Sequence, residues 1–162
     1  MKRFLRRAAV AVLLLLVLIQ LVPYGRAHEN PPVRQEPQWD SPATRALAAR
    51  ACFDCHSNET KWPWYASVAP MSWLVQRDVE EGREHLNFSE WDRPQKDAHE
   101  APEMVEEGEM PPWFYLPMHA EAKLTAEEKA QMIRGLEATV GDDRGHGGDS
   151  GNRGRGSDDG DR

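Results

Sequence analysis

Cysteine is scarce in this sequence: there are two among 162 residues, and both lie within five residues of each other, between Cys52 and His56. A framework of disulfides across the chain is therefore excluded, and any cysteine chemistry is confined to this window. The chain also has no acidic residue before Glu29 and no large apolar side chain after Val140. These absences divide the sequence into a basic and apolar start, a central region that can form a core, and a polar end.

An excess of positive charge is missing as well. Residues 29–140 hold 21 acidic and 11 basic side chains, which argues against a nucleic-acid partner because such partners need a basic surface. The acidic balance fits either ordinary solvation or the steering of a basic redox partner protein. No alternating strand pattern is present, so we expect an all-α domain.

The first 27 residues have the pattern of a membrane anchor or signal segment. Four basic residues precede position 8, and residues 8–22 are apolar apart from Gln20. This charge flank predicts a cytoplasmic N-terminus, with the rest of the chain exported. The apolar run is short for a span, although Phe4 and Leu5 extend it. A cleavable signal peptide is the alternative; we favour a single-pass anchor in a bacterial inner membrane, with the domain in the periplasm.

Three further regions follow this segment. Residues 28–40 are rich in proline and predict an extended linker. Residues 41–140 form the candidate domain, which is small enough that a cofactor would help to complete its core. Residues 141–162 cannot bury apolar surface and are expected to be a disordered tail.

Capping signals predict the first and last helices of the domain. Ser41 and Pro42 mark the start of a helix that runs to residue 51. Thr125 and Glu128 form a capping box for a helix over 126–140, which Gly141 would end. Between them we expect helices over 71–86 and 95–107, a short helix capped by Ser89, and a proline-stiffened loop over 108–113.

The window Cys52-Phe53-Asp54-Cys55-His56 has the spacing used for covalent haem attachment. Two cysteines three residues apart lie on one side of a helical turn, so both sulfurs can reach the vinyl groups of one porphyrin. His56 is then placed to be an iron ligand. Zinc would require more ligands close in the sequence, and a thiol–disulfide motif would be expected in a βαβ setting. We therefore predict one covalently attached haem c per chain.

The ligand opposite His56 is open to several candidates. Met110 is the best of them because Pro111 and Pro112 stiffen its loop, and methionine ligation would suit electron transfer. His119 comes next. The remaining possibilities are an open position and the methionines Met71, Met104 and Met118. Trp62, Trp64 and Tyr65 follow the motif closely, so we expect them to line the haem pocket.

The sequence resembles the bacterial haem-binding domain family, small membrane-anchored proteins similar to cytochrome c with one CxxCH motif. The resemblance covers about residues 20–140 and is carried by segments 52–64, 65–70, 72–74, 81–83, 86–91 and 108–112, with His119 and residues 124–125 after them. It implies that Cys52 and Cys55 attach haem, that His56 is the proximal ligand and that Met110 is the distal one. The prolines within 92–102 depart from the continuous helix of the family.

Two functions remain open at this point. The first is one-electron transfer in the periplasm by a haem with His56 and Met110 as axial ligands, without catalysis on a substrate. The second is a haem enzyme or sensor, peroxidase-like or gas-binding, in which the sixth iron position is open or labile. The two differ in what occupies the iron face opposite His56.

Overall fold

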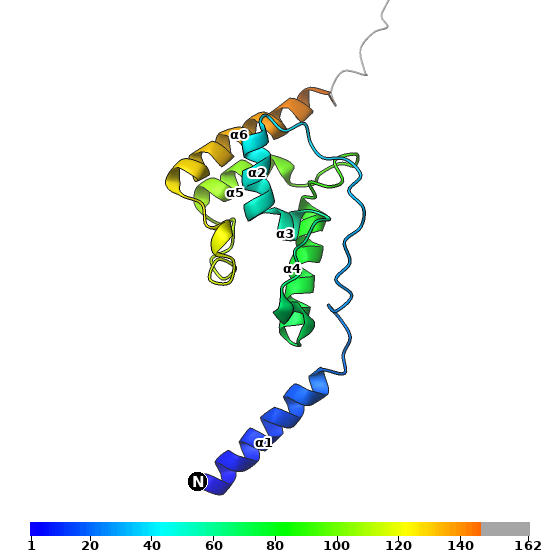
Figure 1. Cartoon of the computed structure of the whole chain (residues 1–162), viewed down its shortest axis with the longest axis vertical. Helices are drawn as coiled ribbons and strands as arrows, with labels where there is room; N and C mark the ends of the chain where they lie inside the picture. Colours follow the sequence, from blue (N-terminus) through cyan, green and yellow to red (C-terminus); the bar gives the residue numbers. More distant parts are fainter. Residues whose placement is uncertain (147–162) are drawn as a thin grey trace, which may run out of the picture.

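The computed structural model describes residues 1–146 and is built of helices (Figure 1). Within these residues no β-strand occurs, and Gln35 and Glu90 form an isolated bridge. The prediction of an all-α domain is confirmed. The α-helices are α1 (Lys2–Ile19), α2 (Pro42–Ala51), α3 (Phe53–His56), α4 (Met71–His85), α5 (Ala101–Glu107) and α6 (Ala126–His146). Three short 3-10 helices join them: η1 (Trp64–Ser67), η2 (Ala98–Glu100) and η3 (Ala120–Ala122).

The N-terminal capping signals predicted for α2 and α6 are confirmed. The Ser41 side chain accepts a hydrogen bond of 3.1 Å from the backbone N–H of Thr44, and Pro42 is the first residue of α2. At the start of α6, the N–H of Glu128 donates to the Thr125 hydroxyl and the N–H of Thr125 donates to the Glu128 carboxylate. This reciprocal pair satisfies backbone donors that a helix start leaves without partners.

Three predicted boundaries were wrong. The helix expected over 95–107 is split, because η2 begins only at Ala98 and α5 follows it. Ser89 does not cap a helix; it is buried, and its hydroxyl accepts a hydrogen bond from the N–H of Asn58. Helix α6 does not stop at Gly141 but continues to His146. Of the tail predicted for 141–162, residues 147–162 lie outside the described part of the chain, and its disorder stays a prediction.

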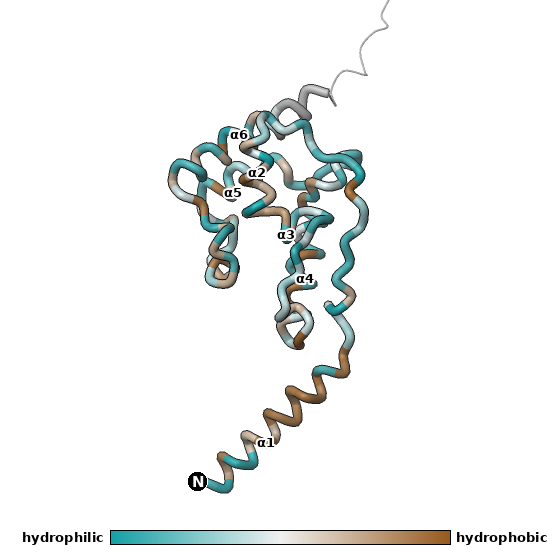
Figure 2. Tube along the Cα trace, in the orientation of Figure 1, coloured by the Kyte–Doolittle hydropathy of each residue, from teal (hydrophilic) through white to brown (hydrophobic). Residues whose placement is uncertain are grey.

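Helix α1 is the segment that was predicted to span a membrane. Within residues 1–146, no helix has both the length and the apolar character needed to cross a membrane. The predicted transmembrane helix is thus not supported, because basic residues at the start of α1 shorten its apolar run (Figure 2).

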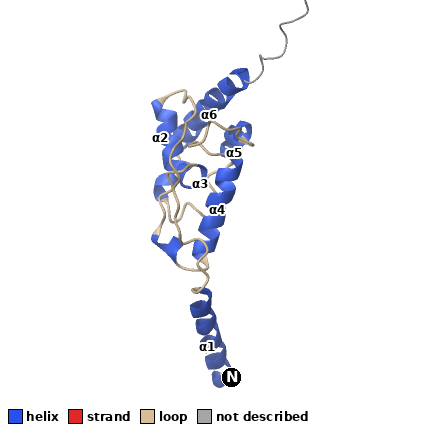
Figure 3. Ribbon diagram, turned by 90° about the vertical axis from the view of Figure 1, so that its right-hand side faces the viewer, coloured by secondary structure: helices blue, strands red, loops and turns tan. Residues whose placement is uncertain are grey.

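The segment after α1 is attached to the domain by specific contacts. The side chain of Gln20 accepts a hydrogen bond from the backbone N–H of Ala69 at 3.0 Å and donates one to its C=O at 2.8 Å. Residues 29–40 then follow an extended path along the domain (Figure 1), which Figure 3 shows turned by 90°.

The apolar core includes Phe53 of the cysteine motif and is rich in aromatic rings. Phe88 stacks between Phe53 and Trp91 at ring distances of 5.8 and 6.0 Å, and Trp39 closes the cluster at 5.1 Å from Phe88. Such rings bury large apolar areas, which a domain of this size needs. The apolar core comprises Leu47, Ala48, Phe53, Leu86, Phe88, Ala98, Val105, Met132, Leu136 and Val140.

Candidate functional site

The cysteine motif forms a sharp corner between two helices. Helix α2 ends at Ala51, and Cys52 leaves helical geometry. The N–H of Cys52 still donates to the carbonyl of Ala48. The chain then turns into α3, in which the N–H of His56 bonds the carbonyl of Cys52 at 2.9 Å. This corner brings Cys52, Cys55 and His56 to the wall of one cavity.

The cavity has a volume of about 540 Å³ and lies between two parts of the domain. One wall comes from α3 and α4, and the other comes from α5 and the loop that follows it. Its apolar lining consists of Ala51, Gly82, Leu86, Phe88, Ala101, Met104, Val105, Met110, Pro112, Phe114 and Leu136. A volume of this size with mainly apolar walls suits an organic cofactor.

The ring of His56 is held by two backbone carbonyls. Its Nδ1 donates to the carbonyl oxygens of Gly82 at 3.0 Å and Leu86 at 3.1 Å. Burial lowers the pKa of His56, which favours the neutral ring. With Nδ1 protonated as a donor, Nε2 keeps its lone pair, and this is the arrangement found in metal-ligating histidines.

Close packing of α4 on α3 makes these bonds possible. A Cβ at Gly82 would lie 2.5 Å from the carbonyl oxygen of Cys55 and 3.1 Å from its Cβ. Only a residue without a side chain lets the two backbones approach this closely. Gly82 therefore positions both the Cys55 backbone and the carbonyl that orients His56.

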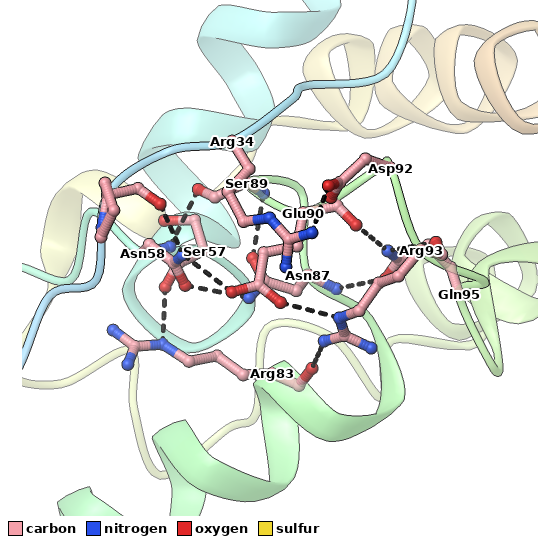
Figure 4. A network of polar contacts seen from close by, with 11 residues as sticks. Arg34, Ser57, Asn58, Arg83, Asn87, Ser89, Glu90, Asp92, Arg93 and Gln95 are labelled. Carbon is pink, nitrogen blue, oxygen red and sulfur yellow. Dashed lines mark hydrogen bonds and ion pairs between the residues drawn. The ribbon is translucent and has the colours of Figure 1, made fainter.

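A buried polar network fixes the chain on either side of this contact (Figure 4). The amide of Asn87 donates to Asn58 Oδ1 and accepts from the N–H of Ser89, each at 2.9 Å. Arg83 Nε donates to the carbonyl of Ser57 at 2.8 Å. The backbone N–H of Phe88 also donates to the carbonyl of His56 at 2.8 Å. Together these bonds tie the residues after the motif to the end of α4.

The two thiols do not have the properties of redox-active cysteines. Burial raises the pKa of Cys52 to about 12, and burial together with the charge of Asp78 raises that of Cys55 to about 12. Thiol–disulfide exchange needs a thiolate, which such pKa values suppress. For zinc, the described residues contain no group of three or more His, Cys, Asp or Glu side chains suited to hold a metal ion.

The candidate distal ligands occupy different surroundings. Met110 and Met104 both line the cavity, and the N–H of Met110 bonds the carbonyl of Met104 at 3.0 Å. Met71 and Met118 are exposed at 42% and 60%. Both ring nitrogens of His119 are engaged elsewhere, Nδ1 with the carbonyl of Tyr115 and Nε2 with the hydroxyl of Tyr65.

The three predicted aromatic wall residues are not brought to the cavity. Trp62 stacks on His28 at 4.9 Å and donates to Asn30 Oδ1. Trp64 is 78% exposed, and Tyr65 contacts His119 instead. The aromatic side chains that line the cavity are Phe88, Phe114 and Tyr115.

Some residues at the site were not singled out from the sequence. Gly82 had a local signal, since a glycine inside a charged helical segment suggests close packing. Asp54 lies between the two cysteines, and its carboxylate accepts a hydrogen bond of 2.6 Å from the hydroxyl of Tyr115. No sequence pattern pairs Asp54 with Tyr115, because 61 positions separate them.

The fold and the site define a small helical domain with a cofactor cavity, in which two cysteines, two methionines and two histidines meet. His56 has its Nδ1 bonded to two backbone carbonyls, and the exposed His85 has its Nδ1 bonded to Asp97. These residues fit a haem, since sulfur and imidazole are its usual protein ligands. The model of the haem-binding domain family matches residues 14–138, so the chain belongs to this family and its cofactor is haem. Searches of curated proteins and of solved structures found no match.

Proposed function

We propose that the protein binds one haem covalently through Cys52 and Cys55 and uses it for one-electron transfer, with His56 Nε2 as the proximal ligand. The observation that carries the proposal is the pair of hydrogen bonds from His56 Nδ1 to Gly82 and Leu86, in the cavity wall that also holds both thiols. A bound haem would supply a redox centre whose properties depend on its axial ligands.

Met110 is the proposed distal ligand. Its sulfur would lie in the wall formed by α5 and the following loop, away from the wall of His56. Gly108, with a positive φ of 81°, ends α5, and Pro111 and Pro112 keep residues 110–112 out of a helix. A methionine in this position favours electron transfer over chemistry on a substrate.

Exposed carboxylates among the cavity residues support a basic redox partner. Asp78, Glu81, Glu100 and Glu109 all line the cavity and are exposed. Charges of one sign around a cofactor opening steer partners of the opposite sign and speed their encounter. A basic electron-transfer protein would meet this surface.

An exported location is part of the same proposal. The basic start of α1 and its exposed apolar positions support insertion of this segment into a bacterial inner membrane, as an anchor or as a signal peptide. The haem domain would then lie in the periplasm.

Visible spectra of the purified full-length protein, expressed with haem-attachment machinery, test the axial ligation. The oxidised protein should show the far-red methionine–iron band, and Met110→Ala should abolish it. Met104→Ala is the matched control, because Met104 lines the same cavity, and it should keep the band. Absence of the band in the unmodified protein, with rapid carbon monoxide binding after reduction, would instead favour a haem enzyme or sensor.

A further inference from the structure

The carboxylate of Asp54 connects the cysteine motif to the opposite wall of the cavity. Its Oδ1 accepts a hydrogen bond of 3.0 Å from the N–H of Lys61, and its Oδ2 accepts the 2.6 Å bond from Tyr115. The Thr60 hydroxyl also donates to the Asp54 backbone carbonyl at 2.8 Å. Asp54 is therefore held in place by the chain after the motif, and its second oxygen is available to the distal loop.

The distal loop, residues 108–119, holds Met110 near one end and Tyr115 beyond its tip. At the tip, Trp113 is 80% exposed and Phe114 is 56% exposed, so apolar burial fixes this part of the loop weakly. Tyr115, in contrast, is half-buried and lines the cavity. A specific contact of Tyr115 therefore has a large influence on where the loop lies.

His119 braces the ring of Tyr115. The two rings stack with centroids 3.8 Å apart and planes 7° apart. The hydroxyl of Tyr65 bonds His119 Nε2 at 3.3 Å. This stack limits the rotation of the Tyr115 ring and keeps its hydroxyl directed at Asp54.

We propose that the Tyr115–Asp54 hydrogen bond is a clamp that closes the distal loop over the cavity and so positions Met110 for the iron. Tyr115 and Asp54 are positioning residues, since the clamp acts through the loop. The inference rests on the proposed ligation by Met110. Because the Asp54 carboxylate belongs to the haem-attachment motif, the clamp fixes the distal loop to the segment that also carries the proximal ligand.

The ionisation of Tyr115 is consistent with a permanent clamp. Burial and the hydrogen bond to Asp54 raise the pKa of Tyr115 far above its ordinary value. The hydroxyl therefore stays protonated and remains a donor over the physiological range. Hydrogen bonds to a charged acceptor are stronger than neutral ones, so this single bond can hold a loop whose tip is exposed.

The test compares two hydroxyl deletions in the haem-loaded, full-length protein. Tyr115→Phe removes the clamp and keeps the stacked ring, while Tyr24→Phe removes a hydroxyl that donates to Glu80 at 2.6 Å, away from the cavity. We expect Tyr115→Phe to weaken the far-red methionine band and to speed carbon monoxide binding to the reduced protein about tenfold, the equivalent of losing about 1.4 kcal/mol. Tyr24→Phe should change either readout less than twofold.

Asp54 completes the comparison. Asp54→Asn keeps an oxygen acceptor but loses its charge and should weaken the band less than Tyr115→Phe does, and Asp54→Ala should behave like Tyr115→Phe. The double variant Tyr115→Phe, Asp54→Ala should lose no more of the band than either single variant, because both substitutions remove the same bond. Suppose that the wild-type protein shows the far-red band. The clamp is then overturned if Tyr115→Phe changes neither this band nor the rate of carbon monoxide binding. A wild-type protein without the band, or one in which Met110→Ala keeps it, overturns the proposed ligation first and the clamp with it.

Discussion

The wall of the cavity that carries His56 and the wall that carries Met110 are built in different ways. The first is backed by a close helix–helix contact at Gly82 and by the buried amides of Asn58 and Asn87. The second ends in a loop with exposed Trp113 and Phe114 and is tied across the cavity by Tyr115.

This difference separates what the site fixes from what it can adjust. Buried and fully satisfied polar networks hold one geometry, because every broken bond leaves a polar group without water. A loop with few buried contacts opens at low cost. The imidazole is thus preorganised, whereas the distal ligand depends on a small number of contacts. Substitutions in the His56 wall should therefore cost more stability than substitutions in the distal loop.

The largest loss of stability is expected from Gly82→Ala. The new Cβ would lie 2.5 Å from the Cys55 carbonyl oxygen, so α4 and α3 must separate. We expect a loss of about 3 kcal/mol in the free energy of unfolding, measured with denaturant. Gly141→Ala is the matched control: a Cβ there has no neighbour within 4 Å, and stability should not fall. Equal stability of the two variants would contradict the close contact.

Asn87→Ala should have the next largest effect. Asn87 is 1% exposed, and its removal leaves the Ser89 N–H and Asn58 Oδ1 buried without this partner. The expected cost is about 2 kcal/mol in thermal or denaturant unfolding. Gln131→Ala, an exposed amide on α6, should change stability by less than about 0.5 kcal/mol. If both substitutions are neutral, the network does not fix the His56 wall.

A smaller effect concerns pH. The bonds from Arg93 and then from Asn58 lower the pKa of Glu90 below its ordinary value of 4.5. A lowered folded pKa means that Glu90 stabilises the fold fully above the unfolded pKa. This contribution is lost as the pH falls through the lower folded value. Glu90→Gln should therefore flatten the acid dependence of unfolding.

Glu103→Gln, which changes an exposed carboxylate on α5, is the control for this pH experiment. It should leave the dependence of unfolding on pH as in the unmodified protein. An identical acid profile for Glu90→Gln and the unmodified protein would show that Glu90 does not take part in holding Asn58.

The smallest effect is expected at the loop tip. Trp113 is 80% exposed, so Trp113→Ser should change the free energy of unfolding by less than about 0.5 kcal/mol. Trp39→Ser removes a ring of the aromatic core and should cost about 3 kcal/mol. A marked loss in Trp113→Ser would mean that the distal loop is packed as firmly as the His56 wall.

Features encoded by neighbouring residues were predicted well from the sequence. Ser41, the Thr125–Glu128 pair and the proline loop after Gly108 act over a few positions, and the structure confirms each of them. Gly141 misled the prediction of the last helix, because a glycine within a helix costs only about 1 kcal/mol and α6 continues through it.

Features that depend on distant segments could not be predicted. The carbonyls that orient His56 lie 26 and 30 positions away, and Tyr115 lies 61 positions from Asp54. Trp64 was predicted to line the cavity because it follows the motif closely in the sequence. The chain turns away at η1 and leaves this ring in solvent. Pairing of such segments is fixed by tertiary packing and leaves no local pattern.

Covalent attachment at the motif is the central claim, and the intact mass of the denatured full-length protein tests it most directly. Protein from a host with haem-attachment machinery should be heavier than its polypeptide by one haem, and the Cys52→Ser, Cys55→Ser double variant should have the mass of the polypeptide alone. A denatured protein with the bare polypeptide mass, from a preparation that contained haem before denaturation, would contradict the claim.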